Sequence, residues 1–344
     1  METARVAVVI LNWNGEGFLR QFLPNVLQHS AMDGVKVVVA DNGSTDGSLA
    51  LLSEQYPQVE QIRLAQNYGF AEGYNRALTQ VRATYYVLLN SDVEVSDGWL
   101  APLIAFMDSH PQAAACAPKL LSHHHRQQFE YAGAAGGFID RWGYPFCQGR
   151  ILSTIENDRG QYEQPRNIFW ASGAAMFVRA SAYHQAGGLD ARFFAHMEEI
   201  DLCWRFHNMG LQVGYEPTST VYHVGGGTLP NNSPRKLYLN YRNSLYMLHK
   251  NLNALALWPV LLLRMVLDGL SGLAYLASAK PQSTAAVIRA HFDFWRTLSA
   301  SRRTRKQTAK RPRRKIDTIY QRSMLIDFFV LRRQTFDRLK WKRR

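Results

Sequence analysis

Cysteine is scarce in this sequence of 344 residues, and the few present form no recognisable framework. The three cysteines are Cys116, Cys147 and Cys203, an odd number without the short spacing that metal ligands show. A small secreted domain held together by disulfides is therefore excluded, and a reducing compartment fits better.

The amino-terminal residues lack an apolar run long enough to cross a membrane. Val6–Leu11 is apolar but short, and the polar segment Asn12–Gly15 that follows does not resemble a signal-peptide cleavage site. We interpret the run as a buried strand and expect a cytoplasmic protein.

Excess charge of one sign is absent from most of the chain. The formal net charge is +13, but residues 302–344 alone hold 17 Lys or Arg against three Asp, a net charge of +14. The other 301 residues hold 23 Lys or Arg against 24 Asp or Glu, a net charge of −1. A nucleic-acid-binding protein would instead spread its cations over a folded face with interleaved aromatic rings. We therefore expect no specific nucleic-acid partner.

What the first hundred residues do contain is an alternation of apolar strands with helical or turn-rich segments. This pattern predicts an α/β fold with a largely parallel sheet and helices on both faces. Ligands bind such sheets at the carboxyl ends of the strands, where polar clusters occur in this sequence. The predicted strands are Val6–Leu11, Val35–Ala40, Ile62–Leu64 and Tyr85–Leu89, and the clusters are Asn12–Asn14, Asp41–Asp46 and Asn90–Asp92. Later segments predict a helix at Gly73–Arg82, loops and short strands over 120–165, a strand at Phe169–Arg179, and helices at Ile200–Asn208 and Leu237–Leu252.

Asp92 is a first candidate for chemistry. A group transfer that releases a phosphate leaves negative charge on the leaving group, which a cation would stabilise, and an attacking hydroxyl needs a base. Asp92 follows a predicted strand, and Mg²⁺ and Mn²⁺ prefer such oxygen ligands. Polar turns after strands are also common without any metal, so Asp92 alone is weak evidence.

Glu198, Glu199 and Asp201 place three carboxylates within four residues. Crowded carboxylates raise one another's pKa, which suits a general base. An equally good explanation is a helix whose first turn carries acids to complement its dipole. Both interpretations stay open on these residues alone.

Three further patterns permit a functional and a structural interpretation. Trp170, Ser172 and Gly173 belong to a stretch of small residues behind a tryptophan, which would admit a substrate but is more typical of tight strand packing. His223 precedes glycines and would suit a phosphate or a metal, although a lone histidine is more often structural. The run His123–His125 is interpreted as a solvated loop.

Taken in order, these segments resemble the family 2 glycosyltransferases with the GT-A fold, and most closely the rhamnosyltransferase-like bacterial members. The resemblance spans roughly residues 5–250. Each segment is modest, but the ordered set is specific. The segments are Val9–Asn14, Asp41–Gly47, Asn67–Asn75, Leu88–Val93, Ser172–Ala174, Glu198–Arg205, His223 and Arg242–Asn243.

The resemblance implies a fold and a set of binding residues. The implied fold is the GT-A nucleotide-diphospho-sugar transferase fold, a Rossmann-like mixed sheet flanked by helices, with a C-terminal helical extension. Asp41 would contact the nucleobase, and Asp92 with His223 would hold Mg²⁺ or Mn²⁺ on the diphosphate. The other implied donor-binding residues are Asn12, Asn14, Asn67, Gly69, Asn75 and Asn90, and the implied acceptor-binding residues are Trp170, Ser172 and Gly173.

The resemblance also implies an inverting mechanism with a carboxylate base. Glu199 occupies the position of the family's usual catalytic aspartate, and Glu198 and Asp201 are alternative bases. A base opposite the leaving diphosphate implies one in-line displacement, hence inversion. Two departures from the family pattern are Glu199 itself, longer by a methylene, and Asn90, where many members have Asp.

The C-terminal part predicts attachment to a membrane surface. Ala254–Ala279 is long enough to span a bilayer, but Arg264 and Asp268 would lie near its middle, where charges are costly. Their i,i+4 spacing allows them to pair on a helix. We favour a helix that lies in the membrane interface or packs on the catalytic domain over a transmembrane span. With the cationic tail, it predicts peripheral attachment to an anionic membrane on its cytoplasmic side, a solvated tail being the alternative.

The predicted organisation has a catalytic domain at 1–250, an apolar membrane-associating helical segment at 251–300 and a basic tail at 301–344. The predicted reaction moves a sugar, rhamnose by resemblance, from a nucleotide-sugar to a glycan or lipid-linked acceptor. Two alternatives are a basic nucleic-acid-binding protein and a nucleotidyltransferase. The second would normally have a glycine- and cation-rich phosphate loop after its first strand, which this sequence lacks.

Overall fold

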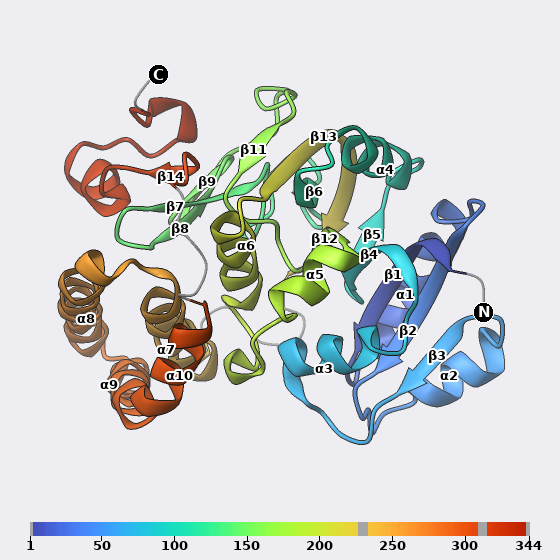
Figure 1. Ribbon diagram of the computed structural model, residues 1–344, viewed down its shortest axis with the longest axis horizontal. Helices are drawn as coiled ribbons and strands as arrows, with labels where there is room; N and C mark the ends of the chain where they lie inside the picture. The colour runs from blue at the N-terminus through green and yellow to red at the C-terminus, as the bar shows by residue number, and fades with distance from the viewer. Residues whose placement is uncertain (1–2, 226–232, 309–314, 342–344) are drawn as a thin grey trace.

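The computed structural model describes residues 3–225, 233–308 and 315–341, which form two sheets flanked by helices (Figure 1). The larger sheet contains β1 (Ala4–Asn12), β2 (Val35–Asp41), β3 (Glu60–Arg63), β4 (Ala83–Asn90), β5 (Val93–Val95), β6 (Ala113–Ser122), β11 (Arg166–Ile168), β12 (Ala175–Arg179) and β13 (Gln212–His223). Its order is β11-β13-β6-β12-β4-β1-β2-β3, and β5 pairs with β13. β4, β1, β2 and β3 are parallel neighbours, whereas β12 is antiparallel to both β4 and β6. The predicted α/β class and mixed sheet are confirmed.

Helices cover both faces of the larger sheet. α1 (Glu16–His29), α2 (Ser48–Gln55) and α4 (Leu100–Ser109) bury apolar side chains against one face, and α3 (Gly69–Leu78), α5 (Ala180–Ala186) and α6 (Glu198–Asn208) do so against the other. β1 illustrates why its sequence is continuously apolar. Val6, Val8 and Ile10 enter the core beneath α1, α2 and α4, while Ala7 and Val9 enter the core on the opposite face, so Val6–Ile10 are all buried.

Two predicted elements differ most from those in the structure, and several others begin or end a few residues away from the predicted bounds. The helix predicted at Gly73–Arg82 begins earlier, at Gly69, where the chain adopts a positive φ that glycine tolerates. The strand predicted over Phe169–Arg179 is confirmed only as β12, because Trp170 instead forms a bridge to Gly137 of the smaller sheet.

The smaller sheet includes a strand from the C-terminal part of the chain. Its strands are β7 (Gly137–Asp140), β8 (Pro145–Cys147), β9 (Arg150–Ile151), β10 (Thr154–Ile155) and β14 (Ile319–Tyr320), and β14 pairs in parallel with β7. The ring centroid of Phe138 lies 5.2 Å from those of both Phe336 and Trp341. Residues 315–341, assigned to the basic tail, therefore contribute a strand and buried aromatic rings to the fold. The tail cations Lys310, Arg311, Arg313, Arg314 and Lys342–Arg344 lie outside the described residues.

The C-terminal helices are α7 (Pro234–Asn251), α8 (Ala254–Ala277), α9 (Pro281–Arg296) and α10 (Leu298–Thr308). Among the described helices, α8 is the one long and apolar enough to cross a membrane by length and composition. Its charged pair, however, faces the protein. Nη1 of Arg264 donates to the carbonyl of Gly143 at 3.3 Å, its guanidinium lies over the Tyr144 ring, and it pairs with Asp268. The costly charges thus anchor α8 to the smaller sheet.

Candidate active site

Side chains tie together the carboxyl ends of β1 and β2. Asn12 and Asp41 are register partners, and Nδ2 of Asn12 donates to Oδ1 of Asp41 and to Oγ of Ser44, each at 3.2 Å. Oδ1 of Asn14 accepts a hydrogen bond from the backbone N–H of Thr45 at 2.7 Å. Asn12 and Asp41 are buried and form the floor of this region, whereas Asn14 is exposed at its rim.

Asn42 organises the next loop, although the sequence assigned it no role. Its Nδ2 donates to Oδ1 of Asn67 at 3.2 Å and to the carbonyl of Gly69 at 3.1 Å. Gly69 has φ +77°, and a Cβ there would lie 2.5 Å from the ring of Phe194. Glycine is therefore required where this loop meets the turn before α6. Asn42 lies within the Asp41–Gly47 segment on which the resemblance rests, so the sequence did point to this part of the chain.

Asn75 makes its side-chain hydrogen bonds with Tyr183 and Leu189, whereas the sequence analysis placed it at the donor. Its Nδ2 donates to the carbonyl of Leu189 at 2.8 Å, and its Oδ1 accepts from the Tyr183 hydroxyl and the Leu189 N–H at 2.8 and 2.9 Å. These contacts fix the loop that precedes Asp190. They argue for a structural role in place of the donor contact that the resemblance implied.

The predicted acceptor residues separate into two environments. Trp170 is buried, its Nε1 donates to the carbonyl of Phe138, and a Cβ on Gly137 would lie 2.0 Å from its ring, which favours packing over acceptor binding. Gly173 lies closer to the predicted base, because a Cβ placed there would be 4.0 Å from Cβ of Glu199. Ser172 is also buried and accepts a hydrogen bond from the Ala174 N–H.

His223 lies between two carboxylates beyond the carboxyl end of β4. Its Nε2 is 3.2 Å from Oδ1 of Asp92 and 3.4 Å from Nδ2 of Asn90, and its Nδ1 is 3.3 Å from Oε1 of Glu130. Burial disfavours a charged imidazole, yet Glu130 and Asp92 together raise the pKa of His223 to about 10. Burial likewise opposes ionisation of Asp92, but His223 lowers the pKa of that carboxyl. The structure thus brings Asn90, Asp92 and His223 together and adds Glu130, which the sequence analysis missed.

This cluster fits a divalent cation whose coordination is completed by substrate. Among the described residues there is no group of three His, Cys, Asp or Glu side chains suited to hold a metal alone. Mg²⁺ at nucleotide sites usually takes one or two carboxylates plus phosphate oxygens and water. Metal-bound histidines commonly direct their second nitrogen at a carboxylate, as His223 directs Nδ1 at Glu130. The carboxylates of Asp92 and Glu130 also favour a positive charge between them, which is why they raise the pKa of His223.

Glu198 and Glu199 occupy the first turn of α6, directly after a strained turn. Phe194, His196 and Met197 have φ values of +64°, +70° and +71°, which non-glycine residues rarely adopt. Oε2 of each glutamate is buried with no hydrogen-bond partner among the described residues. Burial raises the pKa of Glu199 to about 7, and burial with the neighbouring charge of Glu199 raises the pKa of Glu198 well above its usual range. Backbone strain and carboxylates with raised pKa are typical of active sites.

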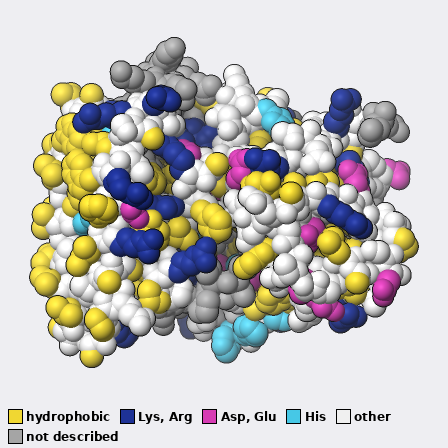
Figure 2. Space-filling model, turned by 90° about the horizontal axis from the view of Figure 1, so that it is seen from below, with side chains coloured by type: hydrophobic (Ala, Val, Ile, Leu, Met, Phe, Trp, Pro, Cys, Tyr) yellow, Lys and Arg dark blue, Asp and Glu magenta, His cyan; other side chains and the backbone are white. Residues whose placement is uncertain are grey.

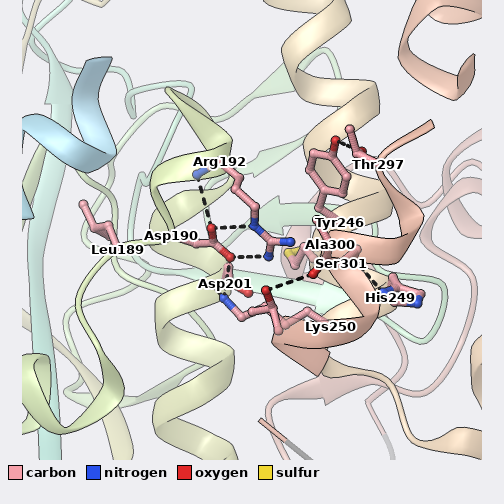
Figure 3. A network of polar contacts seen from close by, with 12 residues as sticks. Leu189, Asp190, Arg192, Asp201, Tyr246, His249, Lys250, Thr297, Ala300 and Ser301 are labelled. Carbon is pink, nitrogen blue, oxygen red and sulfur yellow. Dashed lines mark hydrogen bonds and ion pairs between the residues drawn. The ribbon is translucent and has the colours of Figure 1, made fainter. Parts of the chain in front are cut away.

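Asp201 belongs to a separate polar network that joins α6 to α7 (Figure 3). Its Oδ2 accepts from Nε of Arg205 and Nζ of Lys250, each at 2.9 Å, and its Oδ1 accepts from Nδ2 of Asn251 at 2.8 Å. Lys250 also pairs with Asp190 at 2.8 Å. Because Asp201 is fully buried and both of its oxygens are bound, we no longer consider it a candidate base.

The mixed sheet, with its polar side chains gathered at the carboxyl ends of the parallel strands and an acidic helix start beside them, defines a glycosyltransferase with the GT-A fold. The family model described as "Glycosyl transferase family 2" matches residues 7–187, more than half of the chain. The chain therefore belongs to this family.

Two curated relatives confirm the resemblance to rhamnosyltransferases. The N-acetylglucosaminyl-diphospho-decaprenol L-rhamnosyltransferase of Mycobacterium tuberculosis is 28% identical over 232 residues, which cover 63% of this chain and 75% of the relative. The rhamnosyltransferase WbbL of Escherichia coli strain K12 is 24% identical over 227 residues, which cover 63% of this chain and 83% of the relative.

Solved structures confirm the fold. GalNAc-T7, crystallised with UDP, GalNAc and Mn²⁺, matches with a TM-score of 0.56 at 15% identity, over 72% of this chain and 48% of that one. The mannosyltransferase PcManGT from Pyrobaculum calidifontis, in complex with GDP-Man and Mn²⁺, matches with a TM-score of 0.51 at 14% identity, over 90% of this chain and 81% of that one. At these identities the likeness supports the fold alone.

Proposed function

We propose that this glycosyltransferase moves a sugar from a nucleoside-diphosphate-sugar onto a glycan or lipid-linked acceptor in cell-surface polysaccharide synthesis. The observation that carries the proposal is the gathering of three groups at one edge of the larger sheet: the Asn12–Asp41 pair, the Asp92–His223 pair, and Glu199 beside Gly173. The names of the two rhamnosyltransferase relatives favour rhamnose as the sugar.

The donor would lie across the ends of β1, β2 and β4. Asp41 and Asn14 would border the nucleoside, and Trp13, an exposed aromatic residue next to Asn14 in the sequence, is suited to stack on the base. Mg²⁺ or Mn²⁺ would be held by Asp92 and His223, with Glu130 orienting the imidazole. A cation bound there would neutralise the charge that gathers on the leaving diphosphate.

Glu199 is the proposed general base, with Glu198 as the alternative. A carboxylate with a pKa of about 7 is matched to proton abstraction near neutral pH. It would take the proton of the acceptor hydroxyl as that oxygen attacks the sugar carbon opposite the leaving diphosphate. One such displacement inverts the configuration, and no covalent glycosyl-enzyme is needed.

A lipid-linked acceptor would bring the protein to the cytoplasmic face of a membrane. Figure 2 shows hydrophobic side chains gathered at the end of the molecule that carries α8 and α9, bordered by Lys and Arg. Because Arg264 and Asp268 are buried against the smaller sheet, α8 is better suited to lie on a bilayer than to span it. The large exposed apolar side chains there are Leu255, Trp258, Leu262, Val266, Leu270, Leu273 and Leu276 on α8 and Ile288, Phe292 and Trp295 on α9.

A thermal-shift panel tests the proposal without knowledge of the acceptor. Nucleoside diphosphates and nucleotide-sugars are added with Mn²⁺, with Mg²⁺ or with a chelator, because a ligand that binds only the folded state raises its stability by mass action. We expect one nucleotide-sugar to raise Tm only when metal is present, and Asp92→Ala to abolish that increase. A well-folded protein that responds to none of them would overturn the proposed donor site.

A further inference from the structure

We propose that Asn243 and Arg242, in the middle of α7, are positioning residues that hold the strained turn 192–197 so that Glu198 and Glu199 face the acceptor. The proposal rests on the proposed function only in naming Glu199 as the base. Among the hydrogen bonds and ion pairs of the described residues, those of Arg242 and Asn243 reach the turn and not the carboxylates of Glu198 and Glu199, so we expect their effect to pass through the turn.

Asn243 contacts the turn through its amide nitrogen. Nδ2 lies 2.9 Å from the carbonyl oxygen of Phe193 and 2.8 Å from those of Ala195 and His196. Three carbonyls converge on one amide because the positive φ values at Phe194 and His196 turn successive peptide planes toward α7. The side chain is fully buried, so no water can replace it. Without these donors, the carbonyls of Ala195 and His196 would lose their partner, whereas that of Phe193 would keep the N–H of Ala195 and Nη2 of Arg242.

Arg242 fixes which end of the amide faces the turn. Its Nε donates to Oδ1 of Asn243 at 3.0 Å, which leaves Nδ2 directed at the carbonyls. Its Nη2 donates to the carbonyls of Arg192 and Phe193 at 3.0 and 3.1 Å, so the same guanidinium also holds the start of the turn. A guanidinium supplies these donors in a rigid plane that lysine could not reproduce.

The opposite side of the turn is attached to the donor loop. The carbonyl of Phe194 accepts from the N–H groups of Phe70 and Ala71, at 2.7 and 3.2 Å, in the first turn of α3. The ring of Phe194 also packs on Gly69. The turn is therefore held between α3, which carries predicted donor residues, and α7. This arrangement would set the distance from Glu199 to the donor.

The docking of α7 does not depend on Asn243. Lys250 pairs with Asp190 and Asp201, the Tyr246 hydroxyl bonds to Oγ1 of Thr297, and Nδ1 of His249 is 2.7 Å from Oγ of Ser301 (Figure 3). These contacts join α7 to α6 and to the helices that follow it. Because these other contacts join the helices, we assign the three carbonyl contacts of Asn243 to holding the turn.

Two measurements on the full-length protein test the proposal. Asn243→Asp keeps the side-chain volume but removes the amide donors, and Arg242→Met removes the orienting guanidinium. Asn25→Asp is the matched control, because Asn25 makes two hydrogen bonds to the backbone of Val95, away from the turn. Hydrogen–deuterium exchange is measured over residues 193–201, and kcat and KM are measured with the nucleotide-sugar that the wild type uses.

In Asn243→Asp we expect at least tenfold faster exchange of the amides in 193–201 and a fall in kcat of about 10- to 100-fold, since small displacements of reacting groups have effects of this size. The donor KM should change less than twofold. Unchanged exchange, or a loss of kcat no larger than in Asn25→Asp, overturns the proposal.

Two further outcomes are also decisive. If the wild type uses none of the nucleotide-sugars, the proposed function fails, and the exchange rates alone decide whether Asn243 holds the turn. If Asn243→Asp does not fold, Arg242→Met decides by the same two measurements, with effects in the same direction.

Discussion

Nδ1 of His223 lies 3.3 Å from a carboxylate oxygen of Glu130, although the chain builds most of the smaller sheet between these two residues. Glu130 is itself fixed, because its second oxygen accepts a hydrogen bond from the backbone N–H of Ala132. The ring of His223 is therefore oriented before any ligand arrives, with Nε2 directed at Asp92.

This relationship predicts that Glu130→Gln weakens metal binding. Partners of metal-bound histidines typically contribute about 10- to 100-fold to metal affinity, so we expect the Mn²⁺ concentration for half-maximal stabilisation by the donor to rise by about that factor. A metal titration of the thermal shift measures it. Glu60→Gln, which disrupts an exposed pair with Lys36, is the control, and equal midpoints in the two variants would contradict the role of Glu130.

Exchange of the proposed base for its amide should separate binding from turnover. Glu199→Gln is expected to lower kcat by about 10²- to 10⁴-fold, because a general base contributes roughly that much, while the donor-induced thermal shift stays close to that of the wild type. Glu198→Gln is the matched comparison. If Glu199→Gln keeps most of its activity and Glu198→Gln loses it, the assignment of the base reverses.

The raised pKa of Glu199 has a consequence for stability that needs no substrate. Burial raises the pKa of Glu199 from 4.5 to about 7, so the folded protein holds this proton to higher pH than the unfolded chain does. The unfolded state then binds fewer protons between those values, and the contribution of Glu199 to stability falls as pH rises through that range. We expect Glu199→Gln to raise Tm more at pH 8 than at pH 5. A pH-independent difference in Tm would show that Glu199 titrates normally.

The strands and the polar edge of the sheet were predictable from local sequence. Runs such as Val6–Leu11 are buried on both faces, so their composition alone specifies a strand, and the residues after them reach the same edge by sheet geometry. Glu130 and Asn75 were not predictable in this way. Their roles depend on partners far away in the sequence, His223 and Leu189, which only the tertiary fold supplies.

In the C-terminal region, charge and composition were likewise not enough to predict the structure. The cations of 302–344 concealed aromatic side chains that pack against Phe138 of the smaller sheet, such as the buried Phe336 and the partly buried Trp341. Arg264 and Asp268 predict a helix that does not span a membrane, which stays a prediction, and the partners of Arg264, Gly143 and Tyr144, could not be inferred from helix periodicity.

Lys250 is predicted to matter for stability rather than for chemistry. It is buried and pairs with both Asp190 and Asp201, so Lys250→Met would leave two buried carboxylates short of a partner. Loss of one member of a buried pair typically costs about 3–5 kcal/mol, which we expect for the free energy of unfolding in denaturant. Lys36→Met breaks the partly exposed pair with Glu60 and should cost no more than about 1 kcal/mol. Similar costs for both variants would contradict the importance of this network.

The exposed face of α8 predicts where the protein meets a membrane. Leu262 and Leu273 lie on that face, opposite the buried Arg264. Burying one leucine contributes about 1.5–3 kcal/mol, so Leu262→Asp or Leu273→Asp should weaken binding to vesicles containing anionic lipid by about tenfold or more. Met32→Asp, an equally apolar exposed position in the loop between α1 and β2, should leave binding unchanged. Because the buried charges of α8 stay paired in all three variants, Tm should change little. Vesicle sedimentation that failed to distinguish α8 from Met32 would mean that this apolar face does not contact the bilayer.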